Sequence, residues 1–245
     1  MRIIKNANNK ALKILLVATS ITLIGCSEKD VSELDKDAFW ASEVKKGGYY
    51  LHFRHGNRNR YTVPSSRTPE TDVTGFDGIS AALGLDEKNH SFGLVTCLTE
   101  EGIEEAKLVN EVFNHVGIQI QKVISSPSCR AKQTSLYAFG TEGDEIVNSL
   151  LHYTALPERL KKKASLILKS KILSHSVTPG QNIILSGHNG TLNEIIIDKN
   201  EVGNFDDRDD IGFTVIQKVN GELIARHTFK RFRDFSTQLV VYPLE

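Results

Sequence analysis

Short apolar runs and amphipathic stretches alternate along the chain from residue 47 onward. Apolar or β-branched runs of roughly four to eight residues between turn formers are typical of strands. The pattern predicts strands at 47–53, 122–126, 145–152 and 182–187, and a hairpin over 212–229 that turns at Asn220-Gly221. These segments supply the strands of a central sheet.

Helical periods of apolar residues separate the predicted strands. The clearest is Leu98–Val116, which has acidic residues in its first turn and Gly117 at its end. Further helices are predicted over Ser128–Phe139, Pro157–His175 and Thr191–Ile197. Strands that alternate with helices favour a mostly parallel sheet covered on both faces. The expected fold is therefore an α/β three-layer α/β/α sandwich.

Residues 57–97 interrupt this pattern, because they show no strong period and contain many Gly, Pro and Ser residues. An irregular stretch of this length in a compact domain is usually a functional loop or lid. We expect it to help select the substrate.

The first 25 residues differ from the rest of the chain. Arg2 and three lysines precede a short apolar run, ILLVATSITLIG, which is the layout of a signal peptide. The run ends in Leu-Ile-Gly-Cys26 and resembles a bacterial lipobox, in which the cysteine is lipidated and becomes the mature N-terminus. The alternative is an uncleaved anchor helix, although the run is shorter than the ~18 apolar residues of a typical span.

Residues 26–46 are polar and of mixed charge, so we predict a tether there, with one short helix around Asp37–Val44, ahead of one domain over 47–245. The whole chain has 30 basic and 30 acidic residues. Removal of residues 1–25 takes away four basic residues, and 26 minus 30 leaves a net charge of −4. This balance gives no reason to expect a nucleic-acid partner. The expected location is the cell envelope, with a lipid anchor at Cys26. Ser27 after that cysteine favours the outer membrane, facing the periplasm.

Two cysteines remain in the predicted domain, Cys97 and Cys129, and each precedes a predicted helix. In an oxidising compartment two such thiols can form a disulfide. Two separate buried thiols are an equally good interpretation of the sequence.

Polar residues follow three of the predicted strands. Arg54 and His55 end the first, the segment Ser125–Arg130 follows the second, and Gly187-His188 ends the third. Because the carboxyl ends of parallel strands lie at one edge of the sheet, these residues are expected to meet there. Two guanidinium groups suit phosphate oxygens, and a neutral imidazole can act as a nucleophile. No spacing typical of a metal site accompanies the histidines.

The motifs RHG at 54–56, SSPSCRAKQT at 125–134 and SGHNGTL at 186–192 resemble those of the histidine phosphatase superfamily, also called phosphoglycerate-mutase-like. The segment LTEEGIEEA at 98–106 resembles the family's helix before the second motif. The likeness covers roughly residues 48–192, in the family's order. It implies a phosphoglycerate-mutase-like fold that needs no metal or organic cofactor.

The resemblance also implies roles. His55 would accept the phosphoryl group as a phosphohistidine, while Arg54, Arg130 and His188 would bind its oxygens. Gly56 belongs to the same set of expected substrate contacts.

The acid that protonates the leaving group is harder to assign. Glu158 is the candidate, although an acidic residue at a helix start also has a purely structural explanation. Asn189 stands where one branch of the family has an aspartate, so we expect it to contact substrate without donating a proton as an acid. Arg58 could be a third phosphate ligand, as RHGNR partly matches that branch.

The predicted function is hydrolysis of phosphomonoesters at the cell envelope, with a phosphorylated small molecule or an envelope sugar as substrate. A non-catalytic lipoprotein that binds phosphate or a phosphosugar is the alternative. A phosphohistidine-protein phosphatase is a third possibility, which export disfavours. His52 is interpreted as a packed strand histidine, and the acidic segment DDRDD at 206–210 as a solvated loop.

Overall fold

The computed structural model describes residues 33–58, 97–150, 158–197 and 208–239. Strands are β1 Tyr50–Arg54, β2 Ile120–Ser125, β3 Glu145–Ile146, β4 Asn182–Gly187, β5 Phe213–Val219 and β6 Glu222–Phe229. Helices are α1 Glu33–Lys46, α3 Glu100–Val116, α4 Cys129–Phe139, α5 Glu158–Leu173 and α6 Phe232–Leu239, with a 3₁₀ turn, η2, at Asn148–Leu150.

The strands form one six-stranded sheet in the order β3-β2-β4-β1-β5-β6. The four strands β3, β2, β4 and β1 are parallel, whereas β5 runs antiparallel to β1 and β6 antiparallel to β5. The mostly parallel sheet predicted from the sequence is confirmed. As a result, β1, β2 and β4 end at the same edge.

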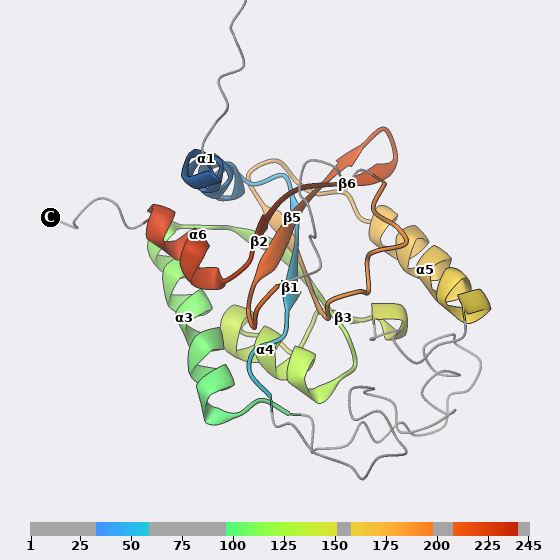
Figure 1. The fold of residues 1–245 in the computed structure, drawn as a ribbon, viewed down its shortest axis with the longest axis horizontal. Coiled ribbons are helices and arrows are strands. Elements are labelled where there is room, and N and C mark those ends of the chain that lie inside the picture. Colours follow the sequence, from blue (N-terminus) through green and yellow to red (C-terminus); the bar gives the residue numbers. More distant parts are fainter. Residues whose placement is uncertain (1–32, 59–96, 151–157, 198–207, 240–245) are drawn as a thin grey trace, which may run out of the picture. The chain divides into compact units, whose positions relative to one another are not determined.

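Alternate residues of the strands enter two separate apolar cores. Leu51 of β1 packs in a cluster with residues of α1, α3, α4 and α6. Its neighbour Tyr50 packs on the other face, with Leu168 and Ile172 of α5. Figure 1 shows α3 and α5 on opposite sides of the sheet. Since helices cover both faces, the predicted three-layer arrangement is confirmed.

The helices that flank the site begin and end where the sequence places their caps. The Thr99 side chain accepts a hydrogen bond from Gly102 N at the start of α3, and Gly117 ends the helix in the left-handed region. Ser128 caps α4 by accepting from Ala131 N, and Gly140 ends it with φ of 77°.

Two predicted elements differ in the structure. Of the strand predicted over 145–152, the described part, which ends at residue 150, has only the two-residue strand β3 and then η2. The helix predicted over Thr191–Ile197 is a series of turns. Its last residues pair instead with β6, because Ile197 N donates to Leu223 O at 3.1 Å and so draws the backbone out of a helical path.

The short helix expected around Asp37–Val44 is present as α1, which is longer and packs into the core instead of forming part of a tether. Ala41 and Val44 are buried in the core. The Trp40 ring stacks on His227 of β6 with 6.3 Å between centroids, and His227 Nε2 lies 2.7 Å from Asp37 Oδ1. The folded domain therefore includes α1 rather than beginning at residue 47.

A charge at Val44 tests whether α1 is part of the domain. Val44→Asp should lower the free energy of unfolding by about 3 kcal/mol, because the carboxylate must be buried or the helix must leave the core. Urea denaturation would measure the loss. Ser42→Asp, on the exposed side of the same helix, should change stability by less than about 0.5 kcal/mol. Equal stabilities for the two variants would show that α1 is not required.

Candidate active site

Backbone hydrogen bonds extend the sheet just past its edge and hold the candidate residues in register. Arg54 of β1 lies beside Gly187 of β4, and His55 N donates to the Gly187 carbonyl at 3.1 Å. On the other side of β4, Ser126 N donates to the Ser186 carbonyl at 2.9 Å. The first residues after three neighbouring strands are thereby brought together.

His55 is buried, with 5% of its surface exposed. Its Nδ1 lies 2.8 Å from the Gly56 carbonyl oxygen. A carbonyl only accepts, so Nδ1 carries the proton and the lone pair of the neutral ring is on Nε2. Burial lowers the pKa of His55 well below its usual value, and the nearby charges of Arg130, His188 and Arg54 lower it further. The ring is therefore neutral at pH 7, as a nucleophile must be.

His188 faces His55, with 5.3 Å between the ring centroids. Its Nε2 lies 3.2 Å from Ser126 Oγ and 3.3 Å from Ser128 Oγ, while Nδ1 lies 3.5 Å from Nη2 of Arg130. A guanidinium can only donate, so Nδ1 is the acceptor and Nε2 carries the proton toward the serine hydroxyls. The ring is only 1% exposed.

Arg130 brings a buried guanidinium to the two imidazoles from the first turn of α4. The helix is tied to the loop after β1 through Thr134. The Thr134 hydroxyl donates to the Arg130 carbonyl at 2.8 Å and accepts from Gly56 N at 3.0 Å. The spacing of the second motif thus has a structural reason: one helical turn separates the Arg130 cation from the Thr134 hydroxyl that holds the loop after His55.

The start of α3 fixes the same loop from the other side. A Cβ built on Gly102 would lie 2.1 Å from the Asn57 carbonyl oxygen, so only glycine allows this approach. The Asn57 carbonyl accepts from Thr99 N at 3.0 Å, and Asn57 N donates to Glu105 Oε2 at 3.2 Å. The segment LTEEGIEEA therefore serves to hold the residues after His55.

Arg54 occupies a different environment from the one expected. Its guanidinium lies 3.2 Å from Asp210 Oδ1 and donates to the Arg208 carbonyl. The side chain is 27% exposed and lines a cavity of about 440 Å³ together with Glu105 and Asp210. It acts on His55 through its charge, but its described bonds are to the segment before β5.

Asn189 is likewise engaged by the segment before β5. Its Nδ2 donates to the Arg208 carbonyl at 3.0 Å, and its Oδ1 accepts from Arg208 Nε at 3.1 Å. Sequence reasoning missed Arg208, because the run DDRDD suggests a solvated loop, whereas this arginine is 1% exposed. Nothing in that run signals burial. The interpretation of His52 is confirmed: it is fully buried, and its Nδ1 accepts from Arg208 at 3.1 Å.

Arg58 is half-buried, and its backbone forms an isolated antiparallel bridge with Leu98. Glu158 is the first residue of α5, and its side chain lies outside the part of the chain that the structure describes. Residues 59–96, most of the predicted substrate loop, also lie outside it, as do the predicted signal peptide and Cys26.

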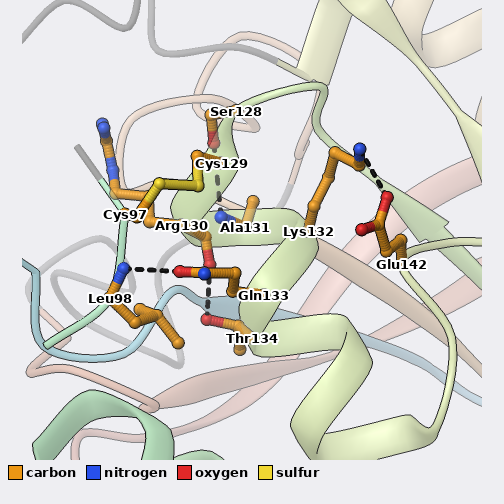
Figure 2. The surroundings of a disulfide bond; sticks show 10 residues. All are labelled: Cys97, Leu98, Ser128, Cys129, Arg130, Ala131, Lys132, Gln133, Thr134 and Glu142. Atoms are coloured by element: carbon orange, nitrogen blue, oxygen red, sulfur yellow. Dashed lines mark hydrogen bonds and ion pairs between the residues drawn. A yellow bond between two sulfur atoms is a disulfide. The ribbon is translucent and has the colours of Figure 1, made fainter. Parts of the chain in front are cut away.

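Cys97 and Cys129 form a disulfide with 4.9 Å between their Cα atoms (Figure 2). Cys129 begins α4 beside Arg130, and the neighbour of Cys97, Leu98, donates its N–H to Gln133 Oε1 at 2.7 Å. The bond therefore joins the chain just before α3 to the helix that carries the buried guanidinium. Bonds of this kind typically stabilise by about 2–4 kcal/mol.

Among the residues that the structure describes, no group of three or more His, Cys, Asp or Glu side chains could hold a metal ion. In that same part of the chain, no helix is both long and apolar enough to cross a bilayer.

No protein-family model matches the sequence, and no curated protein matches it. Solved structures resemble the chain at low identity. The protein histidine phosphatase SixA complexed with tungstate is 13% identical, with a TM-score of 0.45, and the match covers 74% of this chain and 96% of that one. A mycobacterial glucosyl-3-phosphoglycerate phosphatase with inorganic phosphate is 13% identical, with a TM-score of 0.46 over 73% and 94%.

The alpha-ribazole phosphatase from Shigella flexneri is 15% identical, with a TM-score of 0.44 over 73% of this chain and 94% of that one. At these identities and TM-scores the likeness carries no argument of its own. The function proposed below therefore depends on the residues of the site.

The buried histidines predict a pH dependence of stability. The pKa values of both His52 and His55 are well below the usual value, chiefly because burial disfavours the charged ring. Below about pH 6.5 the unfolded chain binds protons at these rings that the folded protein does not. The free energy of unfolding should then fall with decreasing pH, by up to about 1.4 kcal/mol per pH unit for each ring.

Urea denaturation at pH 7.5, 6.5 and 5.5 would measure this slope. A His52→Gln variant should lose about half of it, whereas His115→Gln, at the exposed end of α3, should keep it. A stability that stays constant over this range would contradict the neutral, buried state of the two rings.

Proposed function

We propose that this chain is a phosphatase of the histidine phosphatase superfamily that hydrolyses phosphomonoesters through a phosphohistidine at His55. The observation that carries the proposal is the state of this ring. It is neutral, its proton is on Nδ1, and its Nε2 lone pair lies in a buried cluster with His188 and the guanidinium of Arg130. A nucleophile beside fixed positive charge suits attack on a phosphate ester.

In the first step, Nε2 of His55 attacks the phosphorus and the bond to the ester oxygen breaks. The leaving oxygen takes a proton from a carboxylic acid, for which Glu158 is the candidate. Arg130 and His188 stabilise the charge on the transferring oxygens, and the Gly56 carbonyl holds Nδ1–H as the ring becomes positively charged. Water then attacks the phosphorus and gives a proton to the same carboxylate, the P–N bond breaks, and phosphate leaves with both the neutral ring and the carboxylic acid restored.

No step of this scheme requires a metal ion or an organic cofactor, because binding and charge stabilisation come from the protein's own cations. The substrate proposed is a phosphorylated small molecule or a phosphorylated envelope sugar.

A phosphate- or phosphosugar-binding protein without turnover is the second candidate. Two observations favour it: Asn189, which cannot donate as an acid, is committed to Arg208, and the described bonds of Arg54 go to Asp210 and the Arg208 carbonyl. Turnover separates the two candidates.

We further propose that the protein is held at the cell envelope by a lipid on Cys26. The support is the signal-like sequence before this cysteine and the disulfide, which suits an oxidising compartment. Two or more acyl chains would anchor the protein stably.

Removal of the nucleophile tests the mechanism. His55→Asn should reduce release of phosphate from an aryl phosphate to background, without added metal, because the unprotonated nitrogen of the other imidazole, His188 Nδ1, is turned toward Arg130 at 3.5 Å. His115→Asn is the matched control and should retain wild-type kcat. A labelled phosphoenzyme, trapped by acid quenching, should form in the wild type and not in His55→Asn. Turnover in the variant would remove His55 as the nucleophile.

The role of Glu158 is tested by the leaving group. Glu158→Gln should lower kcat for an alkyl phosphate by roughly 10²-fold or more, the usual scale of general acid catalysis, and affect a good aryl leaving group much less. Both substrates would be compared at saturating concentration. An equal fall in kcat for the alkyl and the aryl phosphate would show that Glu158 only stabilises the start of α5 and is not the general acid.

The anchor is tested by fractionation. In a cell that carries out lipoprotein export, wild-type protein should be found in the membrane fraction, and Cys26→Ser in the soluble fraction or retained with its leader uncleaved. Cleaved Cys26→Ser protein that still sediments with membranes would argue against lipidation as the attachment.

A further inference from the structure

Arg208 is a buried guanidinium that lies just before β5, behind the proposed catalytic groups. Only 1% of its surface is exposed. An arginine keeps its charge in a folded protein, so its burial is costly unless its donors are hydrogen-bonded. A buried arginine in a run of acidic residues therefore needs an explanation, and its contacts supply one.

The side chain of Arg208 reaches two neighbouring strands. Its Nη1 donates to the carbonyl and the Nδ1 of His52 on β1. Its Nε donates to Asn189 Oδ1 at 3.1 Å, and its Nη2 lies 3.5 Å from the His188 carbonyl, both just past β4. The guanidinium thus spans from the middle of β1 to the turn that presents His188.

The backbone of Arg208 also contacts Arg54, the other arginine of the site. Its carbonyl accepts from Arg54 Nη1 and from Asn189 Nδ2. Two residues later, Asp210 forms an ion pair with Arg54. Ile211 adopts a φ of 60°, which is rare for a β-branched residue, and its N–H donates to the His55 carbonyl at 3.4 Å.

We propose that Arg208 is a positioning residue: its side chain fixes the His188–Asn189 turn and its carbonyl fixes the Arg54 guanidinium. This inference rests on the proposed function for its effect on rate. Arg208 acts through the residues that it contacts and does not itself contact the substrate. Because Arg208 holds the backbone of this turn, the His188 ring stays within hydrogen-bond distance of the Ser126 and Ser128 hydroxyls.

The experiment compares Arg208→Met, which keeps the length and removes every donor, with Arg208→Lys, which keeps the charge and loses the fork. Arg226→Met is the control, since Arg226 is a half-buried arginine of β6 whose Nε donates to Gln217. Near-ultraviolet circular dichroism establishes that each variant is folded. The readouts are kcat and KM for an aryl phosphate, and the ¹⁵N imidazole signals of His188, assigned by difference from His188→Gln.

Arg208→Met should lower kcat/KM by roughly 10²-fold, the scale of a small misplacement of catalytic groups. Arg208→Lys should recover part of the loss, and Arg226→Met should stay within about twofold of wild type. In wild type, the His188 signals should show a single tautomer protonated on Nε2. In Arg208→Met they should shift or broaden, whereas in Arg226→Met they should not change.

A folded Arg208→Met with wild-type His188 signals would overturn the inference, whatever its rate. So would an Arg226→Met variant that shows the same changes. If Arg208→Met does not fold, Asn189→Ala, which removes the acceptor of Nε, replaces it under the same criteria. If wild type shows no turnover but Arg208→Met still perturbs His188, the positioning role stands and the proposed phosphatase activity fails.

Discussion

The hydrogen bond from Nδ1 of His55 to the Gly56 carbonyl is the contact on which the chemistry of the site depends. It decides which nitrogen has a lone pair, and burial beside Arg130 keeps that nitrogen unprotonated. The same surroundings that disfavour a charged imidazole favour an anion, so one set of groups both prepares the nucleophile and attracts its target. A single backbone carbonyl can do this only if the loop that carries it is rigid.

The rest of the fold supplies that rigidity from three directions. The Thr134 hydroxyl of α4 holds Gly56 N, the start of α3 holds Asn57, and the Gly187 carbonyl of β4 holds His55 N. The groups that hold this loop, on Thr134, the start of α3 and Gly187, are not among those proposed to touch substrate. Preorganisation of this kind places the cost of ordering in folding rather than in binding.

Much of this arrangement follows from sequence because it is local or follows from strand order. Apolar runs that end in Arg54-His55 and Gly187-His188 predict where parallel strands stop, and the helical periods predict the starts of α3 and α4 to within two residues. The missed features depend on partners far away in the chain. Arg208 is buried by His52, 156 residues earlier, and α1 docks through His227, 190 residues after Asp37. The periodicity of hydrophobic residues carries no information about such distant pairings. The polar residues of α1 and of the run around Arg208 suggest solvent exposure instead.

The place of β1 in the sheet has a consequence for synthesis. This strand lies between β4 and β5, both of which come more than a hundred residues later in the chain. Until those segments have been made, β1 has neither neighbour and both of its edges are open, a state prone to aggregation. A nascent chain that stops before residue 182 therefore leaves both edges of this apolar strand unpaired. Because β1 can pair only with strands that follow it by more than a hundred residues, completion of the sheet is a nonlocal step, of the kind that folds slowly.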